Sequence, residues 1–407
     1  MSALVPEAER SRAAVLRAIA LEGPISRSAI AGQLVVSAAT VTAITRDLID
    51  AGLVEMSGKA PASGRRGRPS ELLSIVPDAV ALLGVKVMHD HVIWVRADLR
   101  GEVAAGGVVP FDPTGADPAD RLGELLAEVV AEADTTWLGV GVGVPGTVDT
   151  GSRGGEQGRV TSPMFGWTGV PLGARLTAGL ALPVVVDNDV NTLAVAEHLY
   201  GRGRDVSDFL TVTLGRGVGL GIFLDGALRR GGRGGAGELG HTRAVTDGPE
   251  CECGRRGCLE AVASDPALVR RAREDGLIGA TDGIEALIAT AETSPAAREL
   301  FTVAGRHLGS AVADLVNLLA PELVVVSGEG IAAWDHIRPG FDEAFSAGVL
   351  DVHATTEVVV DPWDDQDWAR GAAALVLRSV LAPAPDGDSP ETAIRYRLHA
   401  LGTEASA

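Results

Sequence analysis

The sequence predicts an α/β protein in two parts: a small winged helix-turn-helix domain, followed by a larger body in which strands and helices alternate. Three observations lead to this prediction. Serines near the N-terminus stand where they can cap two short helices. Two apolar strands around a basic loop follow these helices. From about Asp78 onward, apolar runs that end in glycine-rich or polar clusters alternate with helical segments.

Composition limits the location and the partners of the protein. The chain has 407 residues and a formal net charge of −19, with no apolar run long enough to cross a bilayer and no N-terminal signal sequence. We therefore expect a cytoplasmic protein without a membrane partner. Residues 1–77 carry nine basic and seven acidic residues, whereas the rest carry 26 and 47. The N-terminal part therefore tolerates a polyanionic partner better than the acidic body does.

The first two helices follow from apolar spacing and a cap. Apolar residues over 15–20 recur at helical spacing and predict a helix of about three turns, which LEGP at 21–24 ends. Ser26 can then cap a short second helix through Leu34. Together with the next helix, this spacing is typical of a helix-turn-helix.

A third helix is predicted from its cap at Ser37 to about Ala51, where Gly52 provides the stop. One face is apolar and would pack against the second helix; it carries Val41, Ile44 and Leu48. The opposite face has small residues and one arginine, which can approach the base edges and phosphates of DNA. With the capping serine, the candidate DNA-binding residues are Ser37, Ala39, Thr40, Thr42, Ala43 and Arg46.

A wing follows the third helix. LVEMS and ELLSIV predict two short strands around the loop GKAPASGRRGRPS. In this loop Arg65, Arg66 and Arg68 stand beside glycines and a proline, so the arm could place guanidinium groups in the minor groove. Taken singly, the arm could be a solvated interdomain linker and the helices a plain helical hairpin. Their order along the chain favours a DNA-binding domain over residues 1–77.

The body begins at about Asp78 with four predicted strands. LLGVKV and HVIWVRADL predict paired strands, LGVGVGVPGTVD predicts a buried strand ending in a glycine-rich turn, and LPVVVDNDVN predicts a strand with a polar cluster at its carboxyl end. Ligands collect at the carboxyl ends of strands in open α/β folds. The polar cluster is therefore a candidate binding site.

All three cysteines of the chain lie in GELGHTRAVTDGPECECGRRGCLE, residues 237–260. An odd number of cysteines without a secretion signal argues against a disulfide framework, which leaves a metal site or three free cysteines in a core. One imidazole and three thiolates match a closed tetrahedral zinc site of structural type. The predicted ligands are His241, Cys251, Cys253 and Cys258. Such a zinc ion would hold a loop in place rather than perform chemistry.

Several motifs of the body resemble those of the ROK family of sugar kinases and sugar-responsive repressors. In order, they are VGVPGTVD, FGWTGVPL, VVVDNDVNTLAVAE, TVTLGRGVGLGIFLDGALRRGGRGGAGELGH, CECGRRGCLEAVAS and HLGSAVADLVNLLAPELVVVSG. The resemblance covers roughly residues 10–380 and implies a two-lobed actin-like ATPase (ribonuclease H-like) sugar kinase fold behind the winged helix.

We expect the lobes of the body at residues 78–195 and 196–381, with the final helix returning to the first lobe. The remaining residues, 382–407, are rich in Pro, Asp and Ser and are expected to be disordered.

The resemblance also implies a sugar site. In ROK kinases the residues that match Asn188, Asp189, Glu238, His241 and Glu260 hydrogen-bond sugar hydroxyls. The residue that matches Asp189 is the general base of those kinases. Carboxylates and amides suit a polyol, because each hydroxyl can both donate and accept. Zinc would orient His241 so that its other ring nitrogen faces the sugar.

The chain departs from the kinases at the phosphate end. ROK kinases carry a D-x-G-G-T loop whose backbone amides cradle ATP phosphates. Residues 86–90, from Lys86 to Asp90, stand in that place and contain no glycine. The second glycine-rich loop, GRGVGLG, has Arg216 where the kinases have a small hydroxyl residue. We therefore expect neither ATP binding nor a catalytic residue in this chain.

The sequence thus predicts a transcriptional repressor that binds double-stranded operator DNA as a homodimer or tetramer and senses a sugar effector. Two alternatives stay open. An active sugar kinase with an accessory DNA-binding domain is disfavoured by the altered phosphate loop. A structural adaptor with a dead site is disfavoured by the complete set of residues that match hydroxyl contacts.

Overall fold

A computed structural model describes residues 7–59, 70–149, 151, 156–361, 364–382 and 389–404. The chain divides into two compact units: Met1–Tyr200 with Trp368–Ala407, and Gly201–Asp367. The chain passes into the second unit at Gly201 and returns to the first unit at Trp368, within helix α12 (Asp365–Leu381). No helix among the described residues is long and apolar enough to span a membrane.

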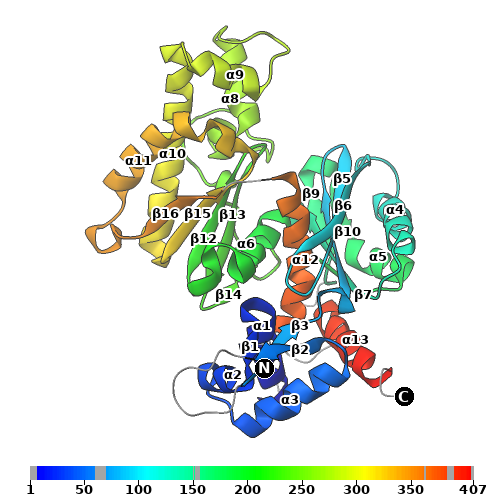
Figure 1. Ribbon diagram of the computed structural model, residues 1–407. Helices are drawn as coiled ribbons and strands as arrows, with labels where there is room; N and C mark the ends of the chain where they lie inside the picture. The colour runs from blue at the N-terminus through cyan, green and yellow to red at the C-terminus, as the bar shows by residue number, and fades with distance from the viewer. Residues whose placement is uncertain are drawn as a thin grey trace. The chain divides into compact units, whose positions relative to one another are not determined.

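The first unit opens with the winged helix that the sequence predicts (Figure 1). Its elements are α1 (Glu7–Glu22), β1 (Ile25–Ser26), α2 (Arg27–Leu34), α3 (Ala38–Asp50), β2 (Val54–Lys59) and β3 (Glu71–Ile75). The strands form an antiparallel sheet in the order β1-β3-β2. Helix α1 spans 16 residues and is longer than the predicted three turns. Each serine cap forms as predicted, because Ser26 accepts from Ala29 N and Ser37 accepts from Thr40 N.

A five-stranded sheet forms the centre of the first unit, in the order β11-β7-β4-β5-β6. Its strands are β4 (Ala81–Val87), β5 (His91–Ala97), β6 (Val103–Pro110), β7 (Trp137–Val144) and β11 (Val184–Asn188). Strands β4, β7 and β11 are parallel, and the other two are antiparallel to their neighbours. A small sheet adds β8 (Thr147–Val148), β9 (Val160–Ser162) and β10 (Trp167–Val170). The four strands predicted for the body are confirmed.

Side-chain alternation decides which helices cover each face of this sheet. The helices of the body part of this unit are α4 (Pro118–Glu132), α5 (Leu172–Leu180), α6 (Asp189–Tyr200) and α12 (Asp365–Leu381). Leu83, Val85 and Val87 share one hydrophobic core with the buried side chains of α4 and α5. On the opposite face, Gly84 and Gly141 lie against the backbone of α12 so closely that a Cβ atom would clash with it. These glycines of β4 and β7 therefore allow close packing of helix on strand.

The second unit has a five-stranded sheet in the order β14-β13-β12-β15-β16. Its strands are β12 (Phe209–Leu214), β13 (Val218–Leu224), β14 (Ala227–Leu228), β15 (Leu323–Ser327) and β16 (Glu357–Val360). Its helices are α7 (Glu260–Ala263), α8 (Asp265–Glu274), α9 (Ile284–Ala291), α10 (Pro295–Leu319) and α11 (Trp334–Gly348). Val212, Val326 and Phe301 join the sheet and the helices in one hydrophobic core. Parallel pairing of β12 with β15 brings their carboxyl ends to one edge.

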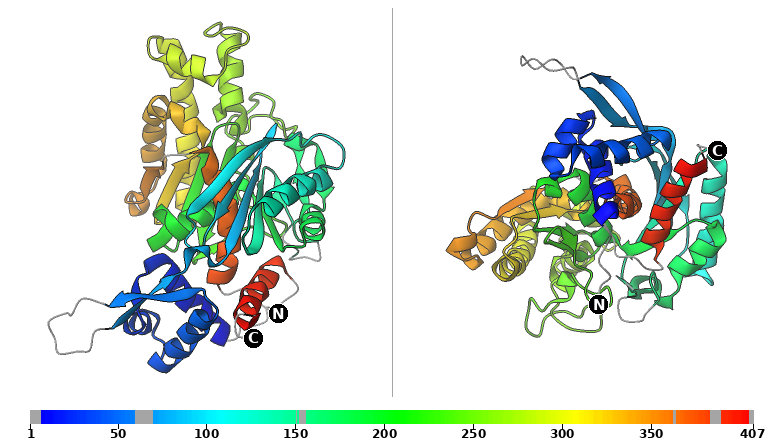
Figure 2. Two further views of the ribbon diagram at one scale, coloured as in Figure 1. Left: turned by 45° about the vertical axis from the view of Figure 1, so that its right-hand side comes forward. Right: turned by 90° about the horizontal axis from the view of Figure 1, so that it is seen from below.

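The prediction of a disordered tail over 382–407 is wrong for residues 390–404, which form helix α13 (Pro390–Glu404). Ser389 caps this helix by accepting from Thr392 N, and Pro390 suits its first turn. Ile394 and Leu398 are buried, and α13 contacts both β7 and α3. Figure 2 shows α13 beside the winged helix in both views. Tertiary burial of one apolar stripe therefore orders a segment whose composition suggests disorder.

Candidate functional site

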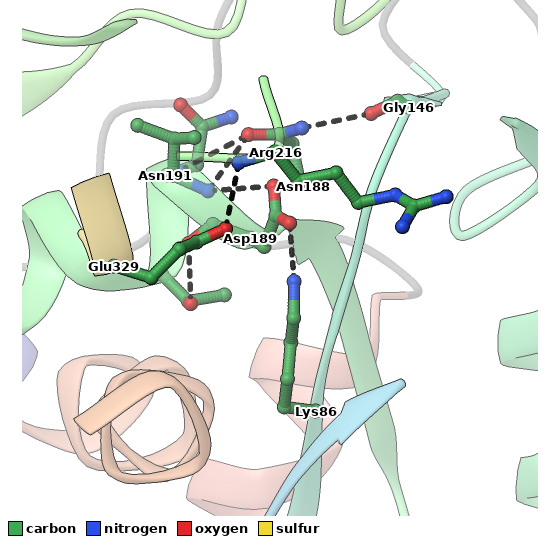
Figure 3. Close-up of polar contacts among 9 residues, drawn as sticks. Lys86, Gly146, Asn188, Asp189, Asn191, Arg216 and Glu329 are labelled. Carbon is green, nitrogen blue, oxygen red and sulfur yellow. Dashed lines mark hydrogen bonds and ion pairs between the residues drawn. The ribbon is translucent and has the colours of Figure 1, made fainter. Parts of the chain in front are cut away.

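Asp189 lies at the first position of helix α6, directly after strand β11, and its carboxylate is engaged on both oxygens (Figure 3). Oδ2 forms an ion pair with Nζ of Lys86, and Oδ1 accepts from the backbone N–H of Val190 at 2.9 Å. The Lys86 side chain is only 5% exposed, and Nζ lies 4.8 Å from the centroid of the Trp368 ring. Lys86 therefore neutralises Asp189 inside the first unit.

Asn188 acts as the cap of helix α6 (Figure 3). Its Oδ1 accepts from Val190 N at 2.9 Å and from Asn191 N at 3.3 Å. Its Nδ2 donates to the carbonyl of Gly146 at 3.0 Å. Buried Asp187 supports the same junction, because its Oδ1 accepts from Asn191 Nδ2 at 2.8 Å. The polar cluster DNDVN therefore builds a rigid strand-to-helix turn.

The four predicted metal ligands converge in the second unit. One ligand atom from each of His241, Cys251, Cys253 and Cys258 can be chosen so that all four lie within 4.8 Å of one another. The Nδ1 atom of His241 lies 3.6 Å from Cys251 Sγ, and Cys253 Sγ lies 3.7 Å from Cys258 Sγ. Tight turns at Gly254 and Gly257, both with positive φ, bring the cysteines together. This cluster could hold a metal ion.

The thiols of this cluster differ in their tendency to ionise. Burial raises the pKa of the Cys251 thiol to about 12 and also raises the pKa of Cys258. Burial opposes ionisation of Cys253 as well, but hydrogen bonds from Arg255 outweigh it and lower its pKa to about 6. One thiolate is therefore favoured while the others stay protonated. A bound cation would favour ionisation of all three, since a coordinating thiol is deprotonated.

Two carboxylates of the predicted sugar site, those of Glu238 and Glu260, lie near the imidazole ring of His241. Nε2 of His241 lies 3.9 Å from Oε2 of Glu238, on the ring edge opposite to the cysteines. Oε1 of Glu260 lies 3.9 Å from Nδ1 of His241, and its Oε2 accepts from Val218 N at 3.2 Å. Glu260 therefore links the cysteine cluster to the start of strand β13. The remaining candidates, Asn188 and Asp189, belong to the other unit.

Helix α3 buries one face and exposes the other. Val41, Thr45 and Leu48 are fully buried, whereas Ile44 is only partly buried. Thr45 is polar and was not part of the predicted apolar face; its hydroxyl accepts from Arg27 Nε at 2.8 Å. All the candidate DNA-binding residues on this helix are exposed: Ser37, Ala39, Thr40, Thr42, Ala43 and Arg46. The candidates Arg65, Arg66 and Arg68 lie outside the described residues.

Helix α6 reaches from Asp189 to the winged helix. Near its C-terminal end, Nε2 of His198 lies 3.3 Å from Nη2 of Arg17 on helix α1. His198 is buried in this unit. A single helix of 12 residues thus has a candidate site residue at one end and a contact with the N-terminal domain at the other.

The family model described as ROK family matches residues 96–379 of the chain. The DNA-binding transcriptional dual regulator NagC of Escherichia coli (strain K12) is 31% identical over 389 residues, with 91% of this chain and 92% of that protein covered. The chain belongs to the ROK family.

Two solved structures of ROK proteins resemble the chain. A ROK family transcriptional regulator, described as a homolog of the E. coli MLC protein, has a TM-score of 0.80 and 26% identity, covering 97% of this chain and 99% of that chain. A ROK family glucokinase from Streptomyces griseus, in complex with glucose and AMPPNP, has a TM-score of 0.62 and 31% identity, covering 72% and 98%. The predicted family and fold class are therefore confirmed.

Sequence reasoning missed two contacts of this ROK protein. One feature of the sequence could have indicated the ion pair of Lys86 with Asp189: Lys86 is one of only two lysines and stands in the apolar strand LLGVKV. A lysine in a buried strand needs a partner carboxylate. The contact of Arg17 with His198 joins residues 181 positions apart, and no local pattern marks it.

Proposed function

We propose that this ROK protein is a sugar-responsive transcriptional repressor. The main support for this proposal is that the first unit contains both a winged helix and Asp189. This unit holds a winged helix with one exposed face on α3, and it holds Asp189 at the start of α6, whose other end meets α1. One compact unit therefore joins a candidate DNA-contacting element to a candidate effector residue.

The DNA-binding surface that we propose is the exposed face of α3. Its small residues would let the helix approach base edges closely, and Arg46 would reach a guanine or a phosphate. Arg65, Arg66 and Arg68 would extend the contact into the minor groove. We propose a homodimer or tetramer on double-stranded operator DNA, since paired winged helices bind paired half-sites.

The effector that we propose is a sugar or sugar derivative. Its ligands would be Asn188, Asp189, Glu238, His241 and Glu260. The metal would be Zn²⁺, because three thiolates and one imidazole form a closed tetrahedral set without a free position for chemistry. With Nδ1 of His241 on the metal side, Nε2 would stay turned toward Glu238. Zinc would thus hold the imidazole in position for the sugar.

We further propose that the body binds the sugar without phosphorylating it. Both oxygens of Asp189 are engaged, one of them by the ammonium of Lys86. The turn after β4 is closed by a hydrogen bond of 2.8 Å from Met88 N to the carbonyl of His91, and its residues include no glycine. These features support loss of phosphoryl transfer, and they disfavour the alternative of an active kinase.

The signal would pass along helix α6. A sugar that bonds to Asp189 would bias the position of α6, and the contact of His198 with Arg17 would transmit this bias to α1. Coupling free energies of about 1–3 kcal/mol are typical for allosteric proteins. Binding of the effector would then change operator affinity by shifting the population of conformations.

Two substitutions test this division of roles once a thermal-shift screen of free and phosphorylated sugars has identified the effector. Asp189→Asn should keep operator affinity without sugar but should raise the effector concentration needed for a response by about one to two powers of ten. Arg46→Ala should lower operator affinity by about tenfold or more and leave sugar binding unchanged. Gel-shift titrations and calorimetry measure both effects.

Arg10→Ala is the matched control for Arg46→Ala, because Arg10 is also exposed but lies on α1. It should leave both kinds of binding close to those of the unaltered chain. An unchanged effector response in folded Asp189→Asn protein would mean that the sugar binds elsewhere. Unchanged operator affinity in Arg46→Ala protein would remove α3 from the DNA interface.

A further inference from the structure

The glycine-rich loop after strand β12 packs closely against the loop after strand β15, within the second unit. Both loops lie at the edge where these parallel strands end. A Cβ atom at Gly330 would lie 2.8 Å from the backbone nitrogen of Gly215, and one at Gly328 would clash with the carbonyl of Leu214. Only glycines permit this approach of backbone to backbone.

Glu329 stands between the two glycines of the second loop, and its carboxylate lies on the first loop (Figure 3). Oε1 of Glu329 accepts from the backbone N–H of Arg216 at 2.9 Å. A Cβ atom at Gly215, where φ is 152°, would overlap the carboxylate carbon of Glu329. The glycine thus leaves room for this one carboxylate.

Backbone N–H groups of glycine-rich loops are anion ligands, and carboxylates and phosphates accept from them in the same way. The loop at residues 215–217 therefore has the chemistry of an anion site, and the chain supplies the anion. The relative solved with AMPPNP, a triphosphate analogue, shares 31% identity and this fold. A triphosphate is thus the type of ligand that the family fold can hold.

Further negative charge lies near Glu329. Asp265 donates its backbone N–H to the carbonyl of Gly215 at 2.8 Å. Burial raises the pKa of the Asp265 carboxyl to about 6, and the charges of Glu329 and Glu285 add to the increase. An incoming polyanion would meet the carboxylate of Glu329, and the carboxyl group of Asp265 is close enough to interact electrostatically with Glu329. Like charges placed together oppose binding strongly.

We infer that Glu329 is a built-in occupant of a polyphosphate-binding loop, and that its carboxylate excludes the triphosphate of a nucleotide from the Arg216 amide. The contact is an autoinhibitory one, made within the second unit by a single side chain. It would keep this protein indifferent to nucleotide concentration. This contact involves the glycine-rich loop alone and is independent of the proposed binding of operator and sugar.

Calorimetric titration of the full chain with magnesium ATP and with tripolyphosphate tests the inference. Glu329→Ala should bind magnesium ATP at least about tenfold more tightly than the unaltered chain, because it frees the amide and removes the charge. Glu329→Gln should gain less, because its amide oxygen can still accept from Arg216. Equal gains for both ligands would indicate recognition of the phosphates, and a gain for ATP alone would indicate that the nucleoside contributes too.

Glu322→Ala is the matched control. Glu322 precedes the opposite end of β15, and its Oε1 accepts from the backbone N–H groups of Ser207 and Asp208 at 3.1 and 3.4 Å. Glu322→Ala also loses contacts between a carboxylate and backbone N–H groups, but these lie away from residues 215–217. It should therefore gain no affinity for magnesium ATP. The inference is overturned if folded Glu329→Ala binds no more tightly than the unaltered chain, or if Glu322→Ala gains as much. Should Glu329→Ala unfold, an affinity gain of zero in Glu329→Gln would overturn it equally.

Discussion

Cys253 differs from its two neighbouring cysteines in its local charge environment. Its pKa is lowered to about 6, whereas burial raises the pKa values of Cys251 and Cys258. Cys253 can therefore supply a thiolate at neutral pH before a metal binds, and the other thiols would lose their protons when it binds. The loop that carries these residues contains glycine turns and little regular structure. Its stability should depend on the metal.

We expect about one zinc ion per chain, and Cys253→Ser should lower both the zinc content and the thermal stability. A loss of about 2 kcal/mol would lower the Tm by roughly 4–8 °C in a compact unit of the length of Gly201–Asp367. Elemental analysis and calorimetry on protein purified without chelator measure the two effects. Glu252→Ser, at the exposed residue between two of the cysteines, is the control and should change neither. Absence of zinc from the unaltered chain would contradict the assignment.

Helix α6 is the element that joins two candidate functions. Its N-terminus carries Asp189, and its C-terminal turn carries His198, which contacts Arg17 of the winged helix. A helix is stiff along its axis, because every turn is hydrogen-bonded to the next. A displacement at one end of α6 is therefore transmitted to its other end. Helix α13 is a second connection, since it contacts both α3 and the sheet of the same unit.

Arg17→Ala should reduce the effect of the sugar on operator affinity by about two- to tenfold, because one hydrogen bond typically contributes about 0.5–1.5 kcal/mol. Operator affinity without sugar and sugar affinity itself should change little. Gel shifts at increasing sugar concentrations measure the ratio of the two operator affinities.

Arg12→Ala is the control for Arg17→Ala. Arg12 lies on the same helix, but it faces Asp47 of α3 at 3.9 Å, inside the winged helix. Its loss should leave the sugar effect intact. Equal sugar effects in Arg17→Ala and in the unaltered chain would exclude the contact with His198 as the route of the signal.

At the scale of the whole molecule, the candidate DNA-binding residues and the candidate ligand-binding residues lie in separate parts of the chain. The exposed face of α3 lies within residues 1–77, and all the candidate sugar and metal residues lie in the ROK body. One face of the sheet of the first unit has a hydrophobic core around Leu83, Val85 and Val140, and among the described residues this core includes none from the winged helix. The body should therefore keep its fold when the N-terminal domain is removed.

A chain of residues 78–407 should retain sugar binding and should fail to shift operator DNA. A thermal-shift titration with the effector measures the first property, and a gel shift measures the second. The full chain is the reference for both. A truncated body that still shifts the operator would place DNA contact outside the winged helix and would refute that assignment.

The sequence by itself determined the local features of this protein. The caps at Ser26 and Ser37, the strands of the body and the convergence of His241 with the three cysteines could all be predicted, because each depends on residues close together in the chain. The family followed from the motifs around these features.

Tertiary structure alone decided the contacts between distant segments. Lys86 and Asp189 are 103 residues apart, and Glu329 lies 113 residues after Arg216. Burial of Ile394 and Leu398 orders helix α13, and a composition rich in proline and aspartate does not indicate this burial. The physical reason is that pairing of a buried charge and burial of an apolar stripe depend on which strands and helices become neighbours. That choice is made by the sheet order, which no short stretch of residues encodes.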